Sequence, residues 1–252
     1  MTRGIFITGA SSGLGAALAT AYAEPSTHLF LAGRDLDRLE KVAQSCRDRG
    51  ATATTVVVDV TERDAIAQAI GEADDRLALD VVIANAGVSG GTSAGRGEKD
   101  EQVRGIFATN VDGVVNTVLP AIARMERRRH GQIALMASLA GYRGQPGAPA
   151  YAASKAAVKV WGEGLRGNLA ARGVGVTVLC PGFVATPMTA INRFPMPFLL
   201  TADKAAALMR KAIDGNRARL AYPWPMAALA WLLAALPPAW VDPLLARLPG
   251  KG

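Results

Sequence analysis

The stretch that decides the fold is residues 8–15, which read Thr-Gly-Ala-Ser-Ser-Gly-Leu-Gly. It follows the short apolar run 5–7, typical of a buried strand, and precedes the alanine-rich stretch 16–23, which predicts a helix. A glycine-rich turn between a strand and a helix lets the backbone approach a phosphate closely, and the first helical turn adds free N–H groups and a positive dipole end. The glycine spacing differs from G-x-G-x-x-G, but the context predicts a dinucleotide phosphate site.

Apolar, strand-like runs alternate with helical stretches along the rest of the chain. We expect further strands at residues 28–32, 53–58, 80–84, 132–137, 174–180 and 217–222. We expect the main helices at residues 36–49, 62–75, 98–128, 151–172 and 201–213, and we expect the helix 98–128, which contains Asn110, to be interrupted near Gly113. Such alternation implies right-handed crossovers, and it predicts an α/β fold: a doubly wound, Rossmann-type parallel sheet of about seven strands with helices on both faces. Because no linker divides residues 1–252, we expect a single domain.

A second informative stretch runs from Tyr151 to Lys155, with Ser138 thirteen residues upstream of the tyrosine. Residues four apart share one face of a helix, so the phenol and the ammonium should point into the same space. A phenol has a pKa of about 10, and a neighbouring cation is expected to lower that pKa toward useful acid/base chemistry. Such a pair alone is usually an accident of a helix surface. Its significance depends on the motifs around it.

These motifs, together with Asn85-Ala86-Gly87, Asn110 and Pro181-Gly182, resemble the short-chain dehydrogenase/reductase family in order and spacing over about residues 4–190. The resemblance implies an NAD(P)-dependent oxidoreductase that interconverts a carbonyl and an alcohol by hydride transfer. The catalytic residues that it implies are Asn110, Ser138, Tyr151 and Lys155. The cofactor-binding residues that it implies are Gly9, Ser11, Ser12, Gly13, Leu14, Gly15, Arg34, Asp59, Val60, Asn85, Ala86, Gly87, Tyr151, Lys155, Pro181, Gly182, Val184 and Thr186.

The turn after the second strand bears on the choice of cofactor. Relatives that prefer NAD usually carry an acid at the strand end, where this chain has Gly33 followed by Arg34, a good partner for a 2′-phosphate. Asp35 lies about 20 residues beyond the glycine-rich turn, where a ribose-binding acid is also expected, but it equally suits the N-cap of the next helix. We favour the cap, and therefore NADP(H), with NAD(H) as the alternative. Asp59 is expected at the adenine ring, or else serves only as a turn residue.

Residues 188–200 should form a substrate-covering lid, and residues 223–252 form an apolar C-terminal extension. The helix predicted over Met226–Leu236, before a Pro237-Pro238 stop, is apolar on every face and spans about 16 Å, against a bilayer core of about 30 Å. It cannot cross a membrane. It could still contact a membrane surface, a second subunit or an apolar substrate.

Charge and composition exclude several classes of protein. The net charge of +7 is spread along the chain without a basic stripe that would indicate nucleic-acid binding. The two histidines are isolated, which predicts no metal site, and the two cysteines lie far apart. Because the chain starts directly with a strand, we expect no signal peptide and a cytoplasmic protein. The resemblance implies a homodimer or homotetramer. The alternatives to a soluble reductase are a peripheral membrane reductase of lipid or acyl ketones and a non-catalytic NADP(H) sensor.

Overall fold

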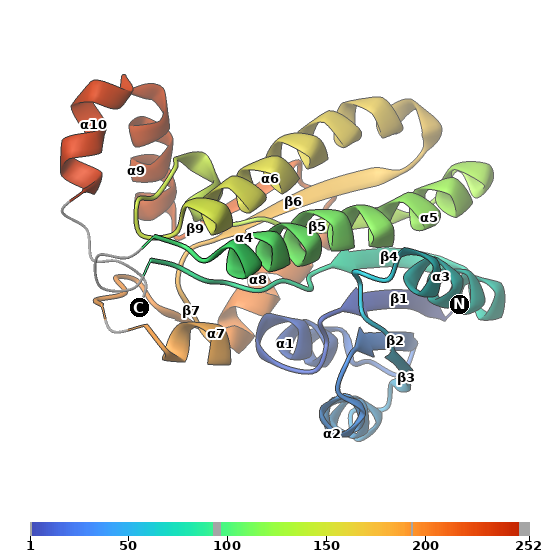
Figure 1. The fold of residues 1–252 in the computed structure, drawn as a ribbon. Helices are drawn as coiled ribbons and strands as arrows, with labels where there is room; N and C mark the ends of the chain where they lie inside the picture. Colours follow the sequence, from blue (N-terminus) through green and yellow to red (C-terminus); the bar gives the residue numbers. More distant parts are fainter. Residues whose placement is uncertain (1, 93–96, 193, 247–252) are drawn as a thin grey trace.

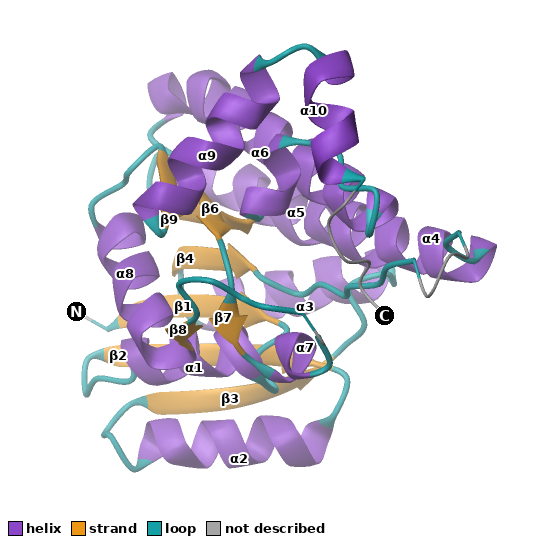
Figure 2. Cartoon of the chain, turned by 90° about the vertical axis from the view of Figure 1, so that its left-hand side faces the viewer, coloured by secondary structure: helices purple, strands orange, loops and turns teal. Residues whose placement is uncertain are grey.

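The computed structural model describes residues 2–92, 97–192 and 194–246 and contains a single parallel sheet of seven strands, flanked by helices (Figures 1 and 2). The strands of this sheet are β1 (Arg3–Thr8), β2 (Thr27–Gly33), β3 (Thr52–Val57), β4 (Leu79–Ala84), β5 (Gln132–Met136), β6 (Gly175–Pro181) and β9 (Arg219–Tyr222). Their spatial order is β3-β2-β1-β4-β5-β6-β9, and each neighbouring pair is parallel. The chain therefore winds outward in both directions from β1 and β4, as predicted, and a crevice for ligands opens where the direction reverses.

The helices form two layers. The α-helices are α1 (Gly13–Tyr22), α2 (Leu36–Arg47), α3 (Arg63–Arg76), α4 (Asp100–Phe107), α5 (Gly113–Arg128), α6 (Pro149–Leu169), α7 (Pro187–Ala190), α8 (Ala202–Asp214), α9 (Trp224–Ala235) and α10 (Pro238–Leu245). Short elements complete the chain: the π-helix η1 (Ala108–Asp112), the 3-10 helices η2 (Leu139–Tyr142) and η3 (Ala170–Arg172), and the two-residue strands β7 (Val184–Ala185) and β8 (Leu200–Thr201), which pair with each other.

Alternation along the strands explains the two layers. In β1, the fully buried Ile5 and Ile7 belong to a core shared with α1, α2 and α8, whereas Phe6 between them belongs to the core under α3, α5 and α6. Successive side chains of a strand point to opposite faces, so a strand that is covered on both sides reads as a continuous apolar run. The run 5–7 in the sequence is therefore the signature of a central strand.

The interruption predicted near Gly113 is present, whereas one C-terminal helix was not predicted. The predicted helix 98–128 is divided by η1, where a one-turn π-helix replaces the regular helix around Asn110. The helix predicted before Pro237-Pro238 does end there, since α9 ends at Ala235, but α10, which begins at Pro238, was not predicted. Proline is tolerated at the first helical position, where its missing N–H would have no intrahelical partner. Parts of three predicted segments (residues 93–96 after β4, residue 193 in the lid and residues 247–252 at the C-terminus) lie outside the described residues.

Length and composition alone would let the run Asp100–Arg128 cross a membrane, and in the described part of the chain it is the one helix that meets both criteria. It has 29 residues, and 44% of its most apolar window is buried inside the protein. It packs on the sheet, and its apolar residues are those of a core helix. Helix α9 is too short to span the hydrocarbon core.

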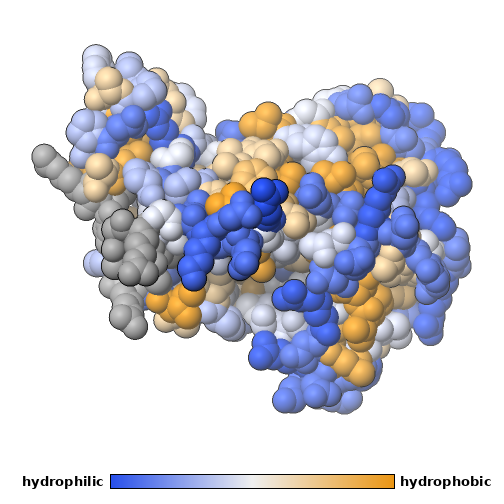
Figure 3. All heavy atoms as spheres, in the orientation of Figure 1, coloured by the Kyte–Doolittle hydropathy of each residue, from blue (hydrophilic) through white to orange (hydrophobic). Residues whose placement is uncertain are grey.

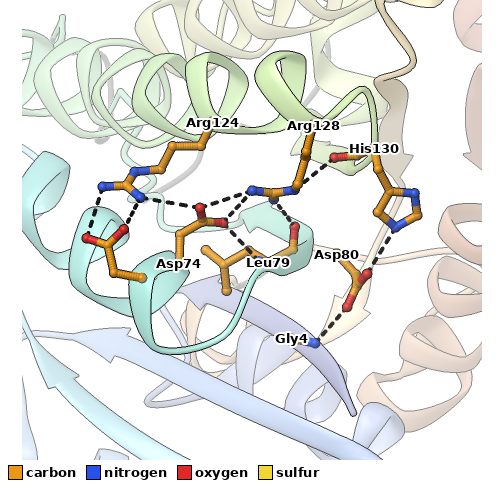
Figure 4. A network of polar contacts seen from close by, with 8 residues as sticks. Gly4, Asp74, Leu79, Asp80, Arg124, Arg128 and His130 are labelled. Carbon is orange, nitrogen blue, oxygen red and sulfur yellow. Dashed lines mark hydrogen bonds and ion pairs between the residues drawn. The ribbon is translucent and has the colours of Figure 1, made fainter. Parts of the chain in front are cut away.

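An ion-pair network ties α3 to α5 at the amino ends of β1 and β4 (Figure 4). The Asp74 carboxylate, whose side chain is only 9% exposed, accepts hydrogen bonds from the Leu79 backbone N–H at 2.9 Å and from the Arg128 guanidinium at 2.9 Å. Arg124 lies 3.4 Å from Asp74 and also pairs with the exposed Asp75 at 2.5 Å. One carboxylate thus pairs with two guanidinium groups and completes the pairing of a buried backbone N–H.

Replacing Asp74 by Ala should lower the free energy of unfolding by about 2–4 kcal/mol, because it leaves the buried Leu79 N–H without its acceptor and removes the carboxylate that pairs with both Arg124 and Arg128. For a chain of this size the melting temperature should fall by about 5–15 °C. Asp75→Ala is the matched control: it removes an acid from the same Arg124, but the Asp75 side chain is 71% exposed and its loss should be small. Equal shifts for both variants in a thermal melt would contradict this account.

Candidate active site

The predicted phosphate turn lies at the carboxyl end of β1, against the turn that follows β4. Gly9 adopts a φ of +65°, which favours glycine, and a Cβ at this position would lie 2.8 Å from the Ala86 Cα atom. The Asn85 side chain donates to the carbonyl oxygens of Thr8 at 2.9 Å and Gly9 at 3.2 Å. A side chain on Gly15 would collide with the Gly9 backbone. These close approaches hold the turn in the shape in which the first turn of α1 faces outward.

A cavity of about 440 Å³ runs from this turn along the carboxyl edge of the sheet. Of the predicted site residues, those that line it are Gly9, Ser11, Ser12, Gly13, Leu14, Arg34, Asn85, Ala86, Gly87, Ser138, Tyr151, Lys155, Pro181, Gly182, Val184 and Thr186. Gly15, Asp59, Val60 and Asn110 do not line it. The residues that it brings together come from β1, β2, β4, β5, β6 and the start of α6, and they are far apart in the sequence.

The cavity has the features that a dinucleotide needs. One end of the cavity lies at the N-terminus of the ten-residue helix α1, where backbone N–H groups and the helix dipole favour the binding of a pyrophosphate. Thr186 faces this end, because a Cβ on Gly13 would lie 3.4 Å from the Thr186 Cβ atom. The other end contains Ser138, Tyr151 and Lys155. The residues present therefore fit an extended dinucleotide.

Ser138 and Tyr151 meet at the reactive end of the cavity. The Ser138 hydroxyl donates to the Pro181 carbonyl at 3.4 Å, accepts from the Ala140 N–H at 3.1 Å, and shares a hydrogen bond with the Tyr151 side chain. Burial raises the pKa of the Tyr151 phenol, and the hydrogen bond with Ser138 lowers it only in part. The expectation that Lys155 lowers this pKa is not met, because burial is the larger effect. The phenol therefore carries its proton at neutral pH.

Lys155 lies one turn along α6 from the tyrosine, and it is almost fully buried, with 4% of its surface exposed. Its ammonium donates to the Met136 carbonyl at 2.8 Å and lies 5.8 Å from the centre of the Tyr151 ring. Burial lowers the pKa of this ammonium to about 8. The cation is held at the edge of the site by a backbone carbonyl, and it keeps the short spacing to the phenol that the sequence predicts.

Asn110 occupies the π-helix η1 and is fully buried behind the cavity. Its side chain accepts from the Val88 N–H at 2.8 Å and donates to the Val88 carbonyl at 2.9 Å and to the Ser154 hydroxyl at 3.0 Å. A Cβ on Gly87 would lie 3.1 Å from the Asn110 Oδ1 atom and 3.3 Å from the Lys155 ammonium. Asn110 thus joins the turn after β4 to α6 and adjoins the lysine. The predicted kink is present, and its hydrogen bonds explain why the helix is interrupted there.

The adenosine end of the cavity contains more charge than the sequence suggested. Asp35 caps α2 by accepting from the Arg38 N–H at 3.0 Å, as predicted, and it pairs with the Arg38 side chain at 3.1 Å. The Arg34 guanidinium lines the cavity, is 73% exposed, and lies 3.5 Å from the Asp59 carboxylate. Burial alone would raise the pKa of Asp59, but hydrogen bonds from Thr61 and the proximity of Arg34 outweigh it, and the pKa is lowered.

Several lining residues were not singled out from the sequence. Arg38 adds a second guanidinium beside Arg34, and Val88, Thr109, Met136 and Thr189 complete the walls. Ser154 donates to the Tyr151 backbone carbonyl at 2.8 Å and so fixes the first turn of α6. Only the spacing of Arg38, four residues after Arg34 at the start of a helix, carried a signal.

Comparison with known proteins agrees with this geometry. The short chain dehydrogenase family matches residues 3–194 of the chain. An uncharacterised oxidoreductase of Myxococcus xanthus is 41% identical over 98% of this chain and 97% of its own length. A 1-deoxy-11-beta-hydroxypentalenate dehydrogenase of Streptomyces exfoliatus is 34% identical over 86% of this chain and 81% of its own.

Solved structures include a 3-oxoacyl-[acyl-carrier protein] reductase from Brucella melitensis, with a TM-score of 0.74 and 27% identity over 84% of each chain. The family match over residues 3–194 covers β1 to β6, the phosphate turn and the stretch from Ser138 to Lys155, and β9 lies beyond it. With seven parallel strands in this order and this set of side chains at their carboxyl edge, the chain belongs to the short-chain dehydrogenase family of oxidoreductases.

Proposed function

We propose that this NAD(P)-dependent oxidoreductase interconverts a carbonyl and an alcohol with NADP(H) as its preferred cofactor and an apolar substrate. The observation that carries the proposal is the convergence of Ser138, Tyr151 and Lys155 at the end of a cavity that begins at a helix N-terminus. The test is turnover of ketones, aldehydes and alcohols of graded polarity with each cofactor. A complete Ser-Tyr-Lys set argues against a protein that only senses the cofactor.

The roles of the side chains follow from their chemistry. The nicotinamide cofactor supplies or accepts the hydride when it is bound. Ser138 and Tyr151 would hydrogen-bond the substrate oxygen and stabilise the negative charge that develops there. Tyr151, which burial keeps protonated, would give that oxygen its proton during reduction and take it back during oxidation. Lys155 would hold the nicotinamide ribose, and Asn110 would position the Lys155 side chain.

The cofactor would lie along the cavity from α1 to α6. The first turn of α1 would bind the pyrophosphate, and the turn after β4 would face the ribose. The predicted adenine contacts of Asp59 and Val60 stay a proposal, since Asp59 accepts from Thr61 and Arg34. The proposal of an apolar substrate is supported by Val88, Met136 and Met188, which line the cavity. Met188 belongs to the proposed lid, residues 188–200.

NADPH should bind more tightly than NADH, because Arg34 and Arg38 line the cavity and Asp35, the acid that lines it beside them, is engaged as a helix cap. Arg34→Ala should weaken NADPH about tenfold or more, since a charge-assisted hydrogen bond contributes about 1.5–3 kcal/mol. The affinity for NADH, which has no 2′-phosphate, should stay the same and is the internal control. Equal affinities of the wild type for both cofactors in a fluorescence titration would refute the preference.

We also propose a homodimer through the outer faces of α4, α5 and α6. Phe107, Leu119 and Val160 are exposed there by 37%, 51% and 63%, which is unusual for three large apolar side chains on neighbouring helices. Light scattering at micromolar concentration should give at least a dimer mass. Leu119→Glu with Val160→Glu should give a monomer, whereas Leu208→Glu on α8, which also replaces an exposed leucine, should not. A monomer mass for the wild type would contradict the proposal.

A further inference from the structure

Helices α9 and α10 form a lobe, residues 224–245, that projects from the carboxyl edge of the sheet (Figures 1 and 3). Its inner side is anchored: Met226 packs against the core, Val241 and Leu245 of α10 are buried, and Arg143 pairs with Asp242 at 3.0 Å. Its outer side is apolar and open. Trp224, Trp231 and Trp240 are exposed by 79%, 62% and 72%, and Leu229, Leu232 and Leu244 by about half.

The distribution of these side chains indicates what covers the lobe. Apolar residues surround the whole circumference of α9, and none of its residues is buried in the chain. The chain itself covers the inner side of α9, where Met226 packs against the core and η2 lies against the helix. The partner therefore has to cover the apolar outer side of the lobe, which the interfacial layer of a bilayer can do. Three of the four tryptophans of the chain lie on this lobe, and tryptophan concentrates where hydrocarbon meets water.

Charge gives a second, independent indication. Residues 220–241 contain no Asp, Glu, Lys or Arg. In the sequence this uncharged run is preceded by Arg217 and Arg219 and followed by Arg247 and Lys251, with Asp242 as the sole acid after Asp214. That acid already pairs with Arg143. Of the cations that flank the run, Arg219 pairs with Glu163 at 2.7 Å. An uncharged, tryptophan-bearing segment between cations complements a surface that is apolar inside and negative outside.

We propose that the α9–α10 lobe docks on an anionic lipid bilayer, lying in its interfacial layer without crossing it. The position of the lobe connects this docking to the site. Helix α9 starts directly after β9, where the Gly182 N–H donates to the Tyr222 carbonyl at 2.7 Å, and Gly182 lines the cavity. η2, which starts next to Ser138, packs against α9. A docked chain therefore holds the mouth of its cavity near the lipid, where carbonyl compounds that partition into membranes are concentrated.

Flotation with lipid vesicles tests the docking without any activity measurement. The full chain should float with vesicles of equal amounts of phosphatidylcholine and phosphatidylserine, and bind vesicles of phosphatidylcholine alone more weakly, because each cation near an anionic surface contributes about fivefold. The double variant Trp231→Glu/Trp240→Glu should bind the anionic vesicles at least tenfold more weakly. Leu208→Glu, the matched control on α8, should bind like the wild type.

Brominated lipid provides a second readout that needs no variant. Bromine in the upper part of the acyl chains should quench the tryptophan fluorescence of the wild type, because three tryptophans would lie in the interfacial layer. The proposal is overturned if the wild type does not float with anionic vesicles, or if the double variant floats as well as the wild type. It is also overturned if the double variant lowers only the mass measured by light scattering, since the lobe would then be covered by a second copy of the chain.

Discussion

Tyr151→Phe should lower kcat by about 10²–10⁴-fold while leaving cofactor affinity within about twofold of the wild type. The phenol shares a hydrogen bond with Ser138, lines the cavity, and is the group that we propose gives the substrate oxygen its proton. Phenylalanine keeps the ring and its packing but removes that proton and one donor to the developing charge. The measurements are kcat with a substrate whose chemical step limits the rate, and a fluorescence titration of the cofactor.

Tyr142→Phe is the matched control for this experiment. Tyr142 lies in η2, close to the site but outside the residues that line the cavity, and burial raises its pKa to about 12. Removing its hydroxyl should change kcat little. Near-normal turnover of Tyr151→Phe, or an equal loss in both variants, would show that the proton comes from another group.

The fold was predictable from the sequence wherever a short local pattern is enough to define a strand, a turn or a helix. The strand-turn-helix at residues 5–23 appears in the structure as β1, the glycine turn and α1, because a buried parallel strand needs a continuous apolar run and the turn needs glycine at Gly9. The strand ends differ from the predicted ones by one or two residues. The prediction failed at α10, because proline after a helix can equally begin the next one.

The sequence predicted which residues belong to the site, but it did not predict all of the contacts that these residues make. Sixteen predicted residues line one cavity, because the carboxyl ends of parallel strands meet at one edge. The π-helix at Asn110 was not predictable from its neighbours in sequence, since its partners Val88 and Ser154 are 22 and 44 residues away. The pKa of Tyr151 is raised because segments distant in the sequence bury its side chain, and the sequence around Tyr151 does not show this burial.

Lys155→Met should lower kcat/KM by about 10²–10³-fold and, unlike Tyr151→Phe, should also weaken the cofactor. Methionine nearly keeps the length of the side chain but loses the cation that would hold the nicotinamide ribose. Lys159→Met is the matched control: Lys159 lies one turn further along α6, pairs with Glu163 at 3.2 Å, and does not line the cavity. Turnover of the Lys159 variant should stay close to that of the wild type.

The melting temperature of Lys155→Met distinguishes this loss of function from damage to the fold. Burial lowers the pKa of Lys155 to about 8 in the folded chain, below the value of 10.5 for a free lysine. Between these two values the unfolded chain binds more protons than the folded one, so this lysine makes the wild type more stable as pH rises from about 8 toward 10.5. Below about pH 8 the full cost of burying the cation is present. Lys155→Met should therefore melt at neutral pH no more than a few degrees below the wild type, and its melting temperature should fall further behind that of the wild type as pH rises from about 8 toward 10.5. A variant that melts far lower at neutral pH, with a pH profile parallel to that of the wild type, would show that Lys155 acts mainly through its hydrogen bond to Met136.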